Sequence, residues 1–338
     1  MTGFHVGSEV GRLRKVLVHR PGLSLQRLTP SNVEELLFDD VVWVRKAGEQ
    51  HDQFVELLRA HDVEVLLLEE LLAETLEHSL AARDEILDSV VHELTVGAAL
   101  AEELRHYLME MASRLLARHL IGGLAKSEIP DVDLSRSLTG QMYSDQDFVL
   151  PPLPNSLFTR DSSCWIYGGV SLNPMYSGVR QLEVVNVAAI YRHHPGFVDA
   201  SFDFWYPPEG RDAGFDLDDF GHSSLEGGDV MPIGNGTVLV GCSERTTPIM
   251  AEQLAQSLFE KEAADRVIAC QMTKDRAHMH LDTVFTFLDR DAVTIYPKVV
   301  DAITAFSLRP GDRPGELDVR QEPSFLAAVE DALGLKEL

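Results

Sequence analysis

The sequence predicts an α/β protein assembled from repeated strand-hairpin modules. In three segments, a charged or titratable residue directly precedes a two-stranded hairpin whose turn contains glycine or aspartate. Asp161, Glu226 and His280 occupy this position in the three segments. The intervals between them have the length of one supersecondary unit, which indicates radial or stacked repeats. Because equivalent positions in a closed ring face a common axis, we expect these three side chains to converge.

The first 70 residues show a strand–helix–strand order, which is typical of an α/β unit. We expect a short strand over residues 13–19 and a buried strand over residues 63–68. A helix is expected over residues 44–60. Its buried side is expected to comprise Phe54, Leu57 and Leu58.

Residues 71–148 carry a different pattern, in which apolar residues recur at helical spacing. One such series is Leu100, Leu104, Tyr107, Leu108, Met111 and Leu115. Strand signals are absent from this block. We therefore expect an all-helical insertion that separates a first module at residues 1–70 from further modules at residues 149–338.

The expected order after the insertion is hairpin, helix and strand, repeated three times. Helices are predicted over residues 179–191 and 324–333, and another is capped by Thr247, with Pro248 at its first position. Further strands are predicted near residues 202–205, 266–270, 292–296 and 317–320.

Composition and charge limit the classes of partner. The 338 residues are 45% hydrophobic with a mean hydropathy of −0.05, as in soluble globular proteins, and their net charge is −25. Such an excess of acids argues against binding to nucleic acids or anionic membranes. The sequence shows neither a signal peptide nor an apolar run of membrane-spanning length, so we expect a cytoplasmic protein. Cys164, Cys242 and Cys270 have no metal-binding spacing and are expected to fill the core.

The segment from His278 to Thr283 leads into a hydrophobic run that is typical of a strand. On a strand, His278, His280 and Asp282 would share one face, because successive side chains alternate between faces. An imidazole beside a carboxylate can transfer protons or bind a metal. A metal-dependent hydrolase is therefore one alternative, although zinc requires further ligands that this short motif does not supply.

Two arginines extend the set of candidate binding residues. Arg245 lies just before a predicted helix, where it either clamps a carboxylate with two hydrogen bonds or pairs with Glu244. Arg180, which follows the first hairpin, has the same two interpretations. Together with the acids, these arginines fit a ligand that is cationic at one end and anionic at the other. An amino acid with a guanidinium side chain has that polarity.

Several motifs resemble those of bacterial arginine deiminase, a guanidino-group-modifying family of the pentein superfamily. Residues 153–161 (LPNSLFTRD), 225–230 (LEGGDV) and 279–283 (MHLDT) look like its signatures, and residues 8–11 (SEVG), 19–22 (HRPG) and 36–40 (LLFDD) are similar to its N-terminus. All six occur in family order, so the resemblance covers the whole chain. It implies an α/β-propeller of ββαβ modules with pseudo-fivefold symmetry and a helical insertion in the first part.

The resemblance also implies roles for individual residues. The substrate would be L-arginine, whose guanidinium nitrogens would be held by Asp161 and Asp282. His280 would be the general acid and base, paired with Glu226. The substrate-binding residues implied are Arg180 and Arg245 at the carboxylate, with Asn155 and Phe158 lining the pocket.

The family reaction uses a cysteine and no metal or other cofactor. A thiolate attacks the guanidinium carbon, ammonia leaves, and water hydrolyses the amidino-thio intermediate to citrulline. The family's cysteine lies in a glycine-rich segment of the fifth module, and the 338 residues end before such a segment. We therefore expect a family member that lacks its last module and is inactive as written.

Two further expectations follow from this departure. A ring without one module exposes two flanks, which favours homo-oligomers. The alternative to an enzyme is a non-catalytic arginine-binding protein.

Overall fold

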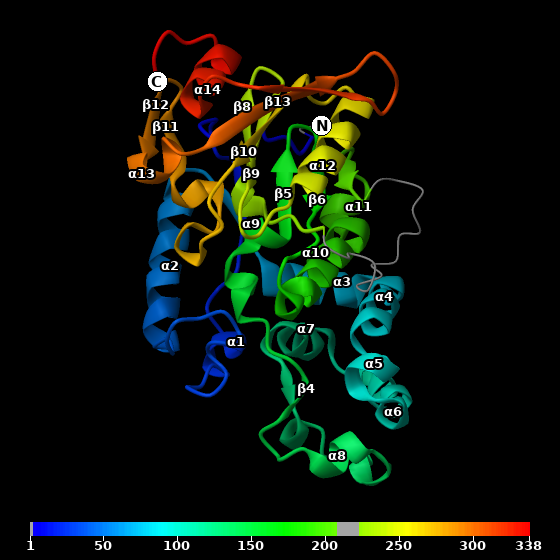
Figure 1. Ribbon diagram of the computed structural model, residues 1–338. Coiled ribbons are helices and arrows are strands. Elements are labelled where there is room, and N and C mark those ends of the chain that lie inside the picture. Colours follow the sequence, from blue (N-terminus) through cyan, green and yellow to red (C-terminus); the bar gives the residue numbers. More distant parts are fainter. Residues whose placement is uncertain (1–2, 208–222) are drawn as a thin grey trace.

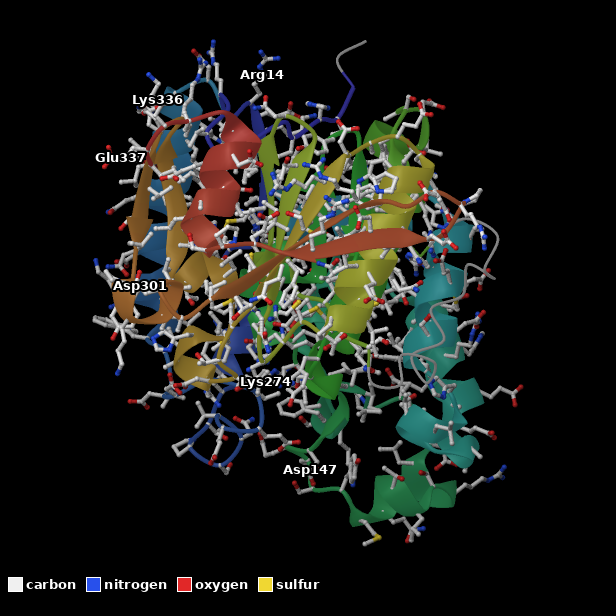
Figure 2. The ribbon with its side chains drawn as sticks, turned by 45° about the horizontal axis from the view of Figure 1, so that its top comes forward. Arg14, Asp147, Lys274, Asp301, Lys336 and Glu337 are labelled. Carbon is white, nitrogen blue, oxygen red and sulfur yellow. The ribbon has the colours of Figure 1, made fainter. Side chains whose placement is uncertain are left out.

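The protein has a mixed α/β architecture, shown in Figure 1 by a computed structural model that describes residues 3–207 and 223–338. The α/β class predicted from the sequence is confirmed. No sheet closes into a barrel within these two described ranges. Charged side chains such as Arg14, Lys274 and Asp301 lie on the outside of the molecule (Figure 2).

The N-terminal unit has the predicted strand–helix–strand order. Strands β1 (Lys15–Val18) and β2 (Glu64–Leu67) pair in parallel, and helix α2 (Val44–Ala60) connects them after the short helix α1 (Leu23–Gln26). The expected buried side of α2 is wrong, because Phe54 and Leu57 are 49% and 58% exposed. The buried residues of the helix are Gly48, which faces the Arg20 side chain, and Val55.

Residues after β2 are mainly helical. The helices are α3 (Leu68–His78), α4 (Leu80–Val90), α5 (Glu93–Val96), α6 (Ala98–Glu110), α7 (Ser113–Gly122) and α8 (Leu138–Met142). The insertion is not all-helical as predicted, because β3 (Leu124–Ala125) pairs with β4 (Phe148–Leu150) in a small antiparallel sheet. Leu72, Ile86, Leu104 and Leu116 of the helices share one hydrophobic core. The division into three domains remains a prediction.

Two ββαβ modules follow with the same strand order. In the first, β5 (Ser163–Ile166) and β6 (Gly169–Leu172) form a hairpin, and β7 (Asp203–Tyr206) returns parallel to β6 after helix α10 (Gln181–His193). In the second, β8 (Val230–Gly234) and β9 (Thr237–Cys242) form the hairpin. Strand β10 (Arg266–Gln271) then pairs in parallel with β9 after helix α12 (Pro248–Glu260), whose first turn is capped by Thr247 as predicted.

The third hairpin departs from this order. Strands β11 (Phe285–Asp289) and β12 (Ala292–Ile295) pair with each other and are followed by the short helix α13 (Pro297–Val300). Strand β13 (Thr304–Pro310), which sequence reasoning missed, pairs with β10 instead of β12. Strand β14 (Leu317–Gln321) adds to its edge, and the chain continues into helix α14 (Phe325–Leu333). The second module therefore belongs to a five-stranded sheet in the order β14-β13-β10-β9-β8.

The described helices are all too short or too polar to cross a lipid bilayer.

Candidate active site

The three hairpins begin at one place in the molecule. Asp161 lies in the short helix α9 (Thr159–Ser162) directly before β5, and Glu226 precedes the turn that leads into β8. His280 precedes a turn that leads into β11. Because these segments contact one another, residues far apart in the sequence meet where the hairpins start.

Asp161, Glu226 and His280 form a buried cluster. The Nε2 atom of His280 lies 2.8 Å from Oε2 of Glu226, and its Nδ1 atom lies 3.9 Å from Oδ1 of Asp161. The three residues are 8%, 0% and 6% exposed, in the order Asp161, Glu226 and His280. The structure thus brings together the three positions that the repeated layout predicted to converge.

Two glycines permit this close approach. A Cβ atom on Gly227 would lie 1.8 Å from the carbonyl oxygen of Arg160, and one on Gly228 would lie 2.6 Å from Nδ1 of His280. Neither position has room for a side chain. The amide of Gly228 also donates a hydrogen bond of 3.2 Å to Asp161. The Glu226-Gly227-Gly228 turn therefore carries the carboxylate while its backbone packs against the other two hairpin starts.

His280 is held in its cationic form. Burial by itself would lower its pKa, but the hydrogen bond to Glu226 and the negative charges of Asp161 and Asp229 raise the pKa of His280 to about 9. At neutral pH the imidazolium therefore donates its Nε2 proton to Glu226. A protonated ring beside a buried carboxylate is suited to deliver a proton to a leaving group.

Asp229 holds the backbone next to His280 in place. Its carboxylate accepts hydrogen bonds from the Ser243 hydroxyl at 2.7 Å and from the Leu281 amide at 2.9 Å, which fixes the backbone next to His280. Burial raises the pKa of Asp229 to about 7, against the opposing charge of His280. Sequence reasoning quoted this acid only as part of a motif. The signal available in the sequence was the short Glu226-Gly227-Gly228-Asp229 spacing, and the structure shows that Asp229 is fully buried.

Arg180 lies directly before α10 and is already paired with acids. Its Nη1 atom donates to Asp161 at 2.9 Å, and its Nε and Nη2 atoms donate to Glu183 at 3.2 and 2.9 Å. These charges raise the pKa of Arg180 even though burial opposes its charge. Glu183 was missed, although its position three residues after Arg180 on a helix start favours this pair.

Arg245 lies on the other side of Glu226. Its Nη1 atom is 3.8 Å from Oε1 of Glu226, and its Nε atom is 3.3 Å from Glu244. The guanidinium also lies 5.4 Å from the centre of the Tyr176 ring, a cation–π distance. Although it pairs with Glu244, it is buried rather than on the surface.

The remaining predicted residues surround this centre at different depths. Asn155 is buried, and its side-chain amide donates to the carbonyl of Leu36 at 2.8 Å. Phe158 is half exposed, with its ring 6.5 Å from that of Phe38. Asp282 lies close to the backbone of Gly228. Burial raises the pKa of Asp282, although the charges of His280 and Arg160 oppose the shift.

The strand expected from His278 onward is wrong. Residues Arg276–His278 and Leu281–Thr283 form 3-10 turns, and the strand begins at Phe285. His278 stacks on Tyr296, with ring centres 5.3 Å apart, so it does not share a face with His280 and Asp282. The turns direct His280 inward to Glu226 instead.

The residues that could hold a metal ion differ from the predicted set of His278, His280 and Asp282. Within residues 3–207 and 223–338, the group of acids and histidines close enough to hold an ion is Asp161, Glu226 and His280. The Nη1 atom of Arg180 lies 2.9 Å from Asp161 and 3.6 Å from Glu226, and the imidazole is protonated at neutral pH. Two cationic groups already face these carboxylates, so the donor set does not fit a divalent metal.

The three cysteines are buried and held as thiols. Burial raises the pKa of Cys164 to about 11 and that of Cys242 to about 12, and it raises the pKa of Cys270 well above its ordinary value. Because the thiolate is the nucleophilic form, these environments disfavour covalent catalysis.

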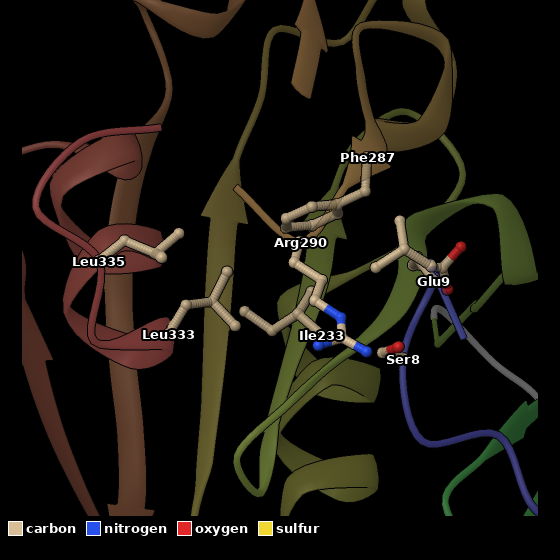
Figure 3. A pocket seen from close by; sticks show the side chains of 8 residues that line it. Ser8, Glu9, Ile233, Phe287, Arg290, Leu333 and Leu335 are labelled. Atoms are coloured by element: carbon tan, nitrogen blue, oxygen red, sulfur yellow. The ribbon is translucent and has the colours of Figure 1, made fainter. Parts of the chain in front are cut away.

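A cavity of about 360 Å³ is lined by residues other than Asp161, Glu226 and His280. Figure 3 shows it between the N-terminal segment, β8 and the C-terminal end of the chain. Its lining residues are Ser8, Glu9, Val10, Ile233, Phe287, Arg290, Leu333 and Leu335. None of the residues predicted for the active site lines it.

Buried carboxylates therefore face an imidazolium and a guanidinium where the hairpins start, on a scaffold that contains two ββαβ modules. Residues 34–338 match the family model of arginine deiminase, and the chain belongs to that family. Membership supports a hydrolase that acts on carbon–nitrogen bonds of guanidino groups.

Solved structures of dimethylarginine dimethylaminohydrolase are similar to the chain at low sequence identity. The enzyme from Pseudomonas aeruginosa, as a cysteine-to-serine mutant complexed with citrulline, is 15% identical with a TM-score of 0.43, covering 97% of this chain and 92% of that one. A dimethylarginine dimethylaminohydrolase adduct with 4-chloro-2-hydroxymethylpyridine is 15% identical with a TM-score of 0.41, covering 84% and 69%. A histidine-to-glycine variant with S-methyl-L-thiocitrulline is 16% identical with a TM-score of 0.42, covering 83% and 69%.

Proposed function

We propose that the protein binds L-arginine at the cluster of Asp161, Glu226 and His280, as an arginine deiminase does. Asp161 and Asp282 would accept hydrogen bonds from the guanidinium nitrogens. Arg245 and Arg180 would hold the substrate carboxylate, next to Asn155 and Phe158. The observation that carries the proposal is the buried set of carboxylates, which already accommodates a guanidinium, that of Arg180.

The proposed reaction converts L-arginine and water to L-citrulline and ammonia. In the reaction that the family resemblance implies, a cysteine thiolate other than Cys164, Cys242 or Cys270 forms a bond to the guanidinium carbon, and the tetrahedral adduct expels one nitrogen as ammonia after His280 protonates it. Water then adds to the amidino-thio carbon while His280 takes back a proton. Collapse of this adduct breaks the carbon–sulfur bond and releases citrulline. Glu226 stabilises the imidazolium whenever His280 carries the proton.

None of Cys164, Cys242 and Cys270 is the proposed nucleophile. Their burial and raised pKa values support this assignment. The 338 residues by themselves would therefore bind arginine without turning it over, as a non-catalytic arginine-binding protein does. The proposed scaffold is an α/β-propeller, for which the shared strand order of β5–β7 and β8–β10 is the support.

Calorimetry and a citrulline assay on the purified 338-residue protein test this proposal. We expect saturable binding of L-arginine and no citrulline above a buffer blank. Asp161→Asn is expected to weaken binding about tenfold or more, because one charge-assisted hydrogen-bond acceptor is lost. The exposed acid Asp301 provides the matched control, and Asp301→Asn leaves affinity unchanged. Absence of L-arginine binding overturns the proposal, and citrulline production would show that one of the three thiols is used.

A further inference from the structure

Arg180 is paired with Asp161, the acid that the proposed function assigns to the guanidinium of the substrate. Its Nη1 atom is 2.9 Å from Oδ2 of Asp161 and 3.6 Å from Oε2 of Glu226, and the side chain is almost fully buried. The other carboxylate oxygen of Asp161 accepts the Gly228 amide and lies 3.9 Å from His280. Both oxygens of Asp161 are therefore in use before any ligand enters.

The other edge of the Arg180 guanidinium is anchored. Nε and Nη2 donate to the buried carboxylate of Glu183, and Nη2 also donates to the carbonyl oxygen of Asn155 at 3.2 Å. All three nitrogens thus have acceptors. To bind a ligand carboxylate, Arg180 has to turn its Nη1 edge away from Asp161, and the same movement frees Asp161 for the ligand's guanidinium.

We propose that Arg180 is a specificity-determining residue that makes the two ends of the ligand bind together, an inference that rests on the proposed arginine-binding function. A guanidine that carries a carboxylate gives Arg180 a new acceptor when it displaces Arg180 from Asp161. A guanidine without a carboxylate leaves the buried Nη1 group of Arg180 with only the longer contact to Glu226, which is costly. The site therefore selects guanidino acids over simple guanidines through exchange of ion pairs.

Arg245 offers a matched comparison within the same site. It lies 3.8 Å from Glu226 and 3.3 Å from Glu244, and Asp161 is not among its ion-pair partners in the described residues. Removal of Arg245 should affect only the ligand's carboxylate. Removal of Arg180 should strengthen binding of the ligand's guanidinium end, because Asp161 becomes free, and weaken binding of its carboxylate end.

The test measures the affinities of L-arginine and n-butylguanidine by calorimetry for three proteins: the unmodified chain, Arg180→Met and Arg245→Met. In Arg180→Met, n-butylguanidine is expected to bind about tenfold tighter, because Asp161 has lost its internal partner. The ratio of the affinity for L-arginine to that for n-butylguanidine should fall accordingly. In Arg245→Met, the affinity for L-arginine should fall, and the affinity for n-butylguanidine should be unchanged. If Arg180→Met also leaves n-butylguanidine unchanged, Arg180 is a plain carboxylate clamp and the inference is overturned.

A second measurement needs no substitution, so it holds even if Arg180→Met does not fold. Acetate supplies the carboxylate separately and should tighten n-butylguanidine binding to the unmodified chain by about threefold at constant ionic strength, with chloride as the control. Equal affinity in acetate and chloride counts against the exchange. If L-arginine itself does not bind the unmodified chain, the proposed function fails; if it binds without these couplings, only the exchange fails.

Discussion

Arg180 and Arg245 are equally buried, at 4% exposed, but their surroundings differ. Arg180 lies within hydrogen-bonding distance of two carboxylates, Asp161 and Glu183. The carboxylate of Glu183 is itself almost fully buried, and burial raises its pKa to about 7 although Arg180 opposes the shift. Arg180 therefore completes a buried network in which its charge offsets those of Asp161 and Glu183.

Arg245 is held much more loosely. Its ion pairs are longer, at 3.8 Å to Glu226 and 3.3 Å to Glu244, and among the described residues its buried Nε atom finds no hydrogen-bond acceptor of good geometry. Tyr176, which is half exposed, covers the guanidinium. The comparison teaches that burial alone does not identify a ligand-binding arginine. An arginine with unused donors is ready for a ligand, whereas a saturated one must first exchange a partner.

The largest expected difference between the two arginines concerns stability. Arg180→Met should lower the free energy of unfolding by about 3–5 kcal/mol, because Glu183 and Asp161 lose a buried partner. Urea unfolding of the variant and the unmodified protein measures the loss. The double variant Arg180→Met/Glu183→Gln, which removes one of the orphaned acids, should recover part of it. A loss below about 1 kcal/mol would contradict the saturated network.

The next effect concerns His280, which shares Glu226 with both arginines. Its folded pKa of about 9 lies above the ordinary value of 6.5, so its stabilisation is complete below pH 6.5 and is lost as the pH rises through 9. Between pH 7 and pH 9.5, the unmodified protein should lose about 2 kcal/mol more stability than His280→Gln.

Urea titrations of both proteins at the two pH values measure this difference. Equal losses would show that His280 is not held as a cation by Glu226, Asp161 and Asp229.

Arg245→Met should have a smaller effect on stability, about 1 kcal/mol, because Glu226 keeps His280 and Arg180 and because Glu244 is partly exposed. Thermal or urea unfolding measures it beside Arg180→Met. If Arg245→Met lowered the free energy of unfolding as much as Arg180→Met does, the two arginines would not differ in how firmly they are held.

The convergence of the three hairpin starts was predictable from sequence because it depends on periodicity. Asp161, Glu226 and His280 occupy the same position directly before three hairpins, and the starts of these hairpins contact one another in the structure. The bounds of α2 and the cap of α12 were equally predictable, since helical spacing and Thr247-Pro248 are local signals.

The partners of each side chain were not predictable in this way. Arg180 could pair with a ligand, with Glu183 or with Asp161, and the choice depends on how α10 packs against the hairpin starts. The strand expected at His278 failed for a related reason, because tertiary contacts fold residues 276–283 into turns that direct His280 to Glu226. The pairing of β13 with β10 likewise follows from the assembled sheet and not from local pattern.

The smallest effect is expected for Glu244, the acid that pairs with Arg245. Glu244→Gln should change stability by less than about 0.5 kcal/mol, because this carboxylate is partly exposed and water screens the pair. It should tighten L-arginine binding about twofold, since Arg245 no longer divides its charge between Glu244 and the ligand. Glu183→Gln is the matched variant on the other arginine and should cost more stability, because its carboxamide cannot satisfy a buried guanidinium edge with two charged acceptors. Equal effects of the two substitutions in urea unfolding would mean that Arg180 and Arg245 are held alike.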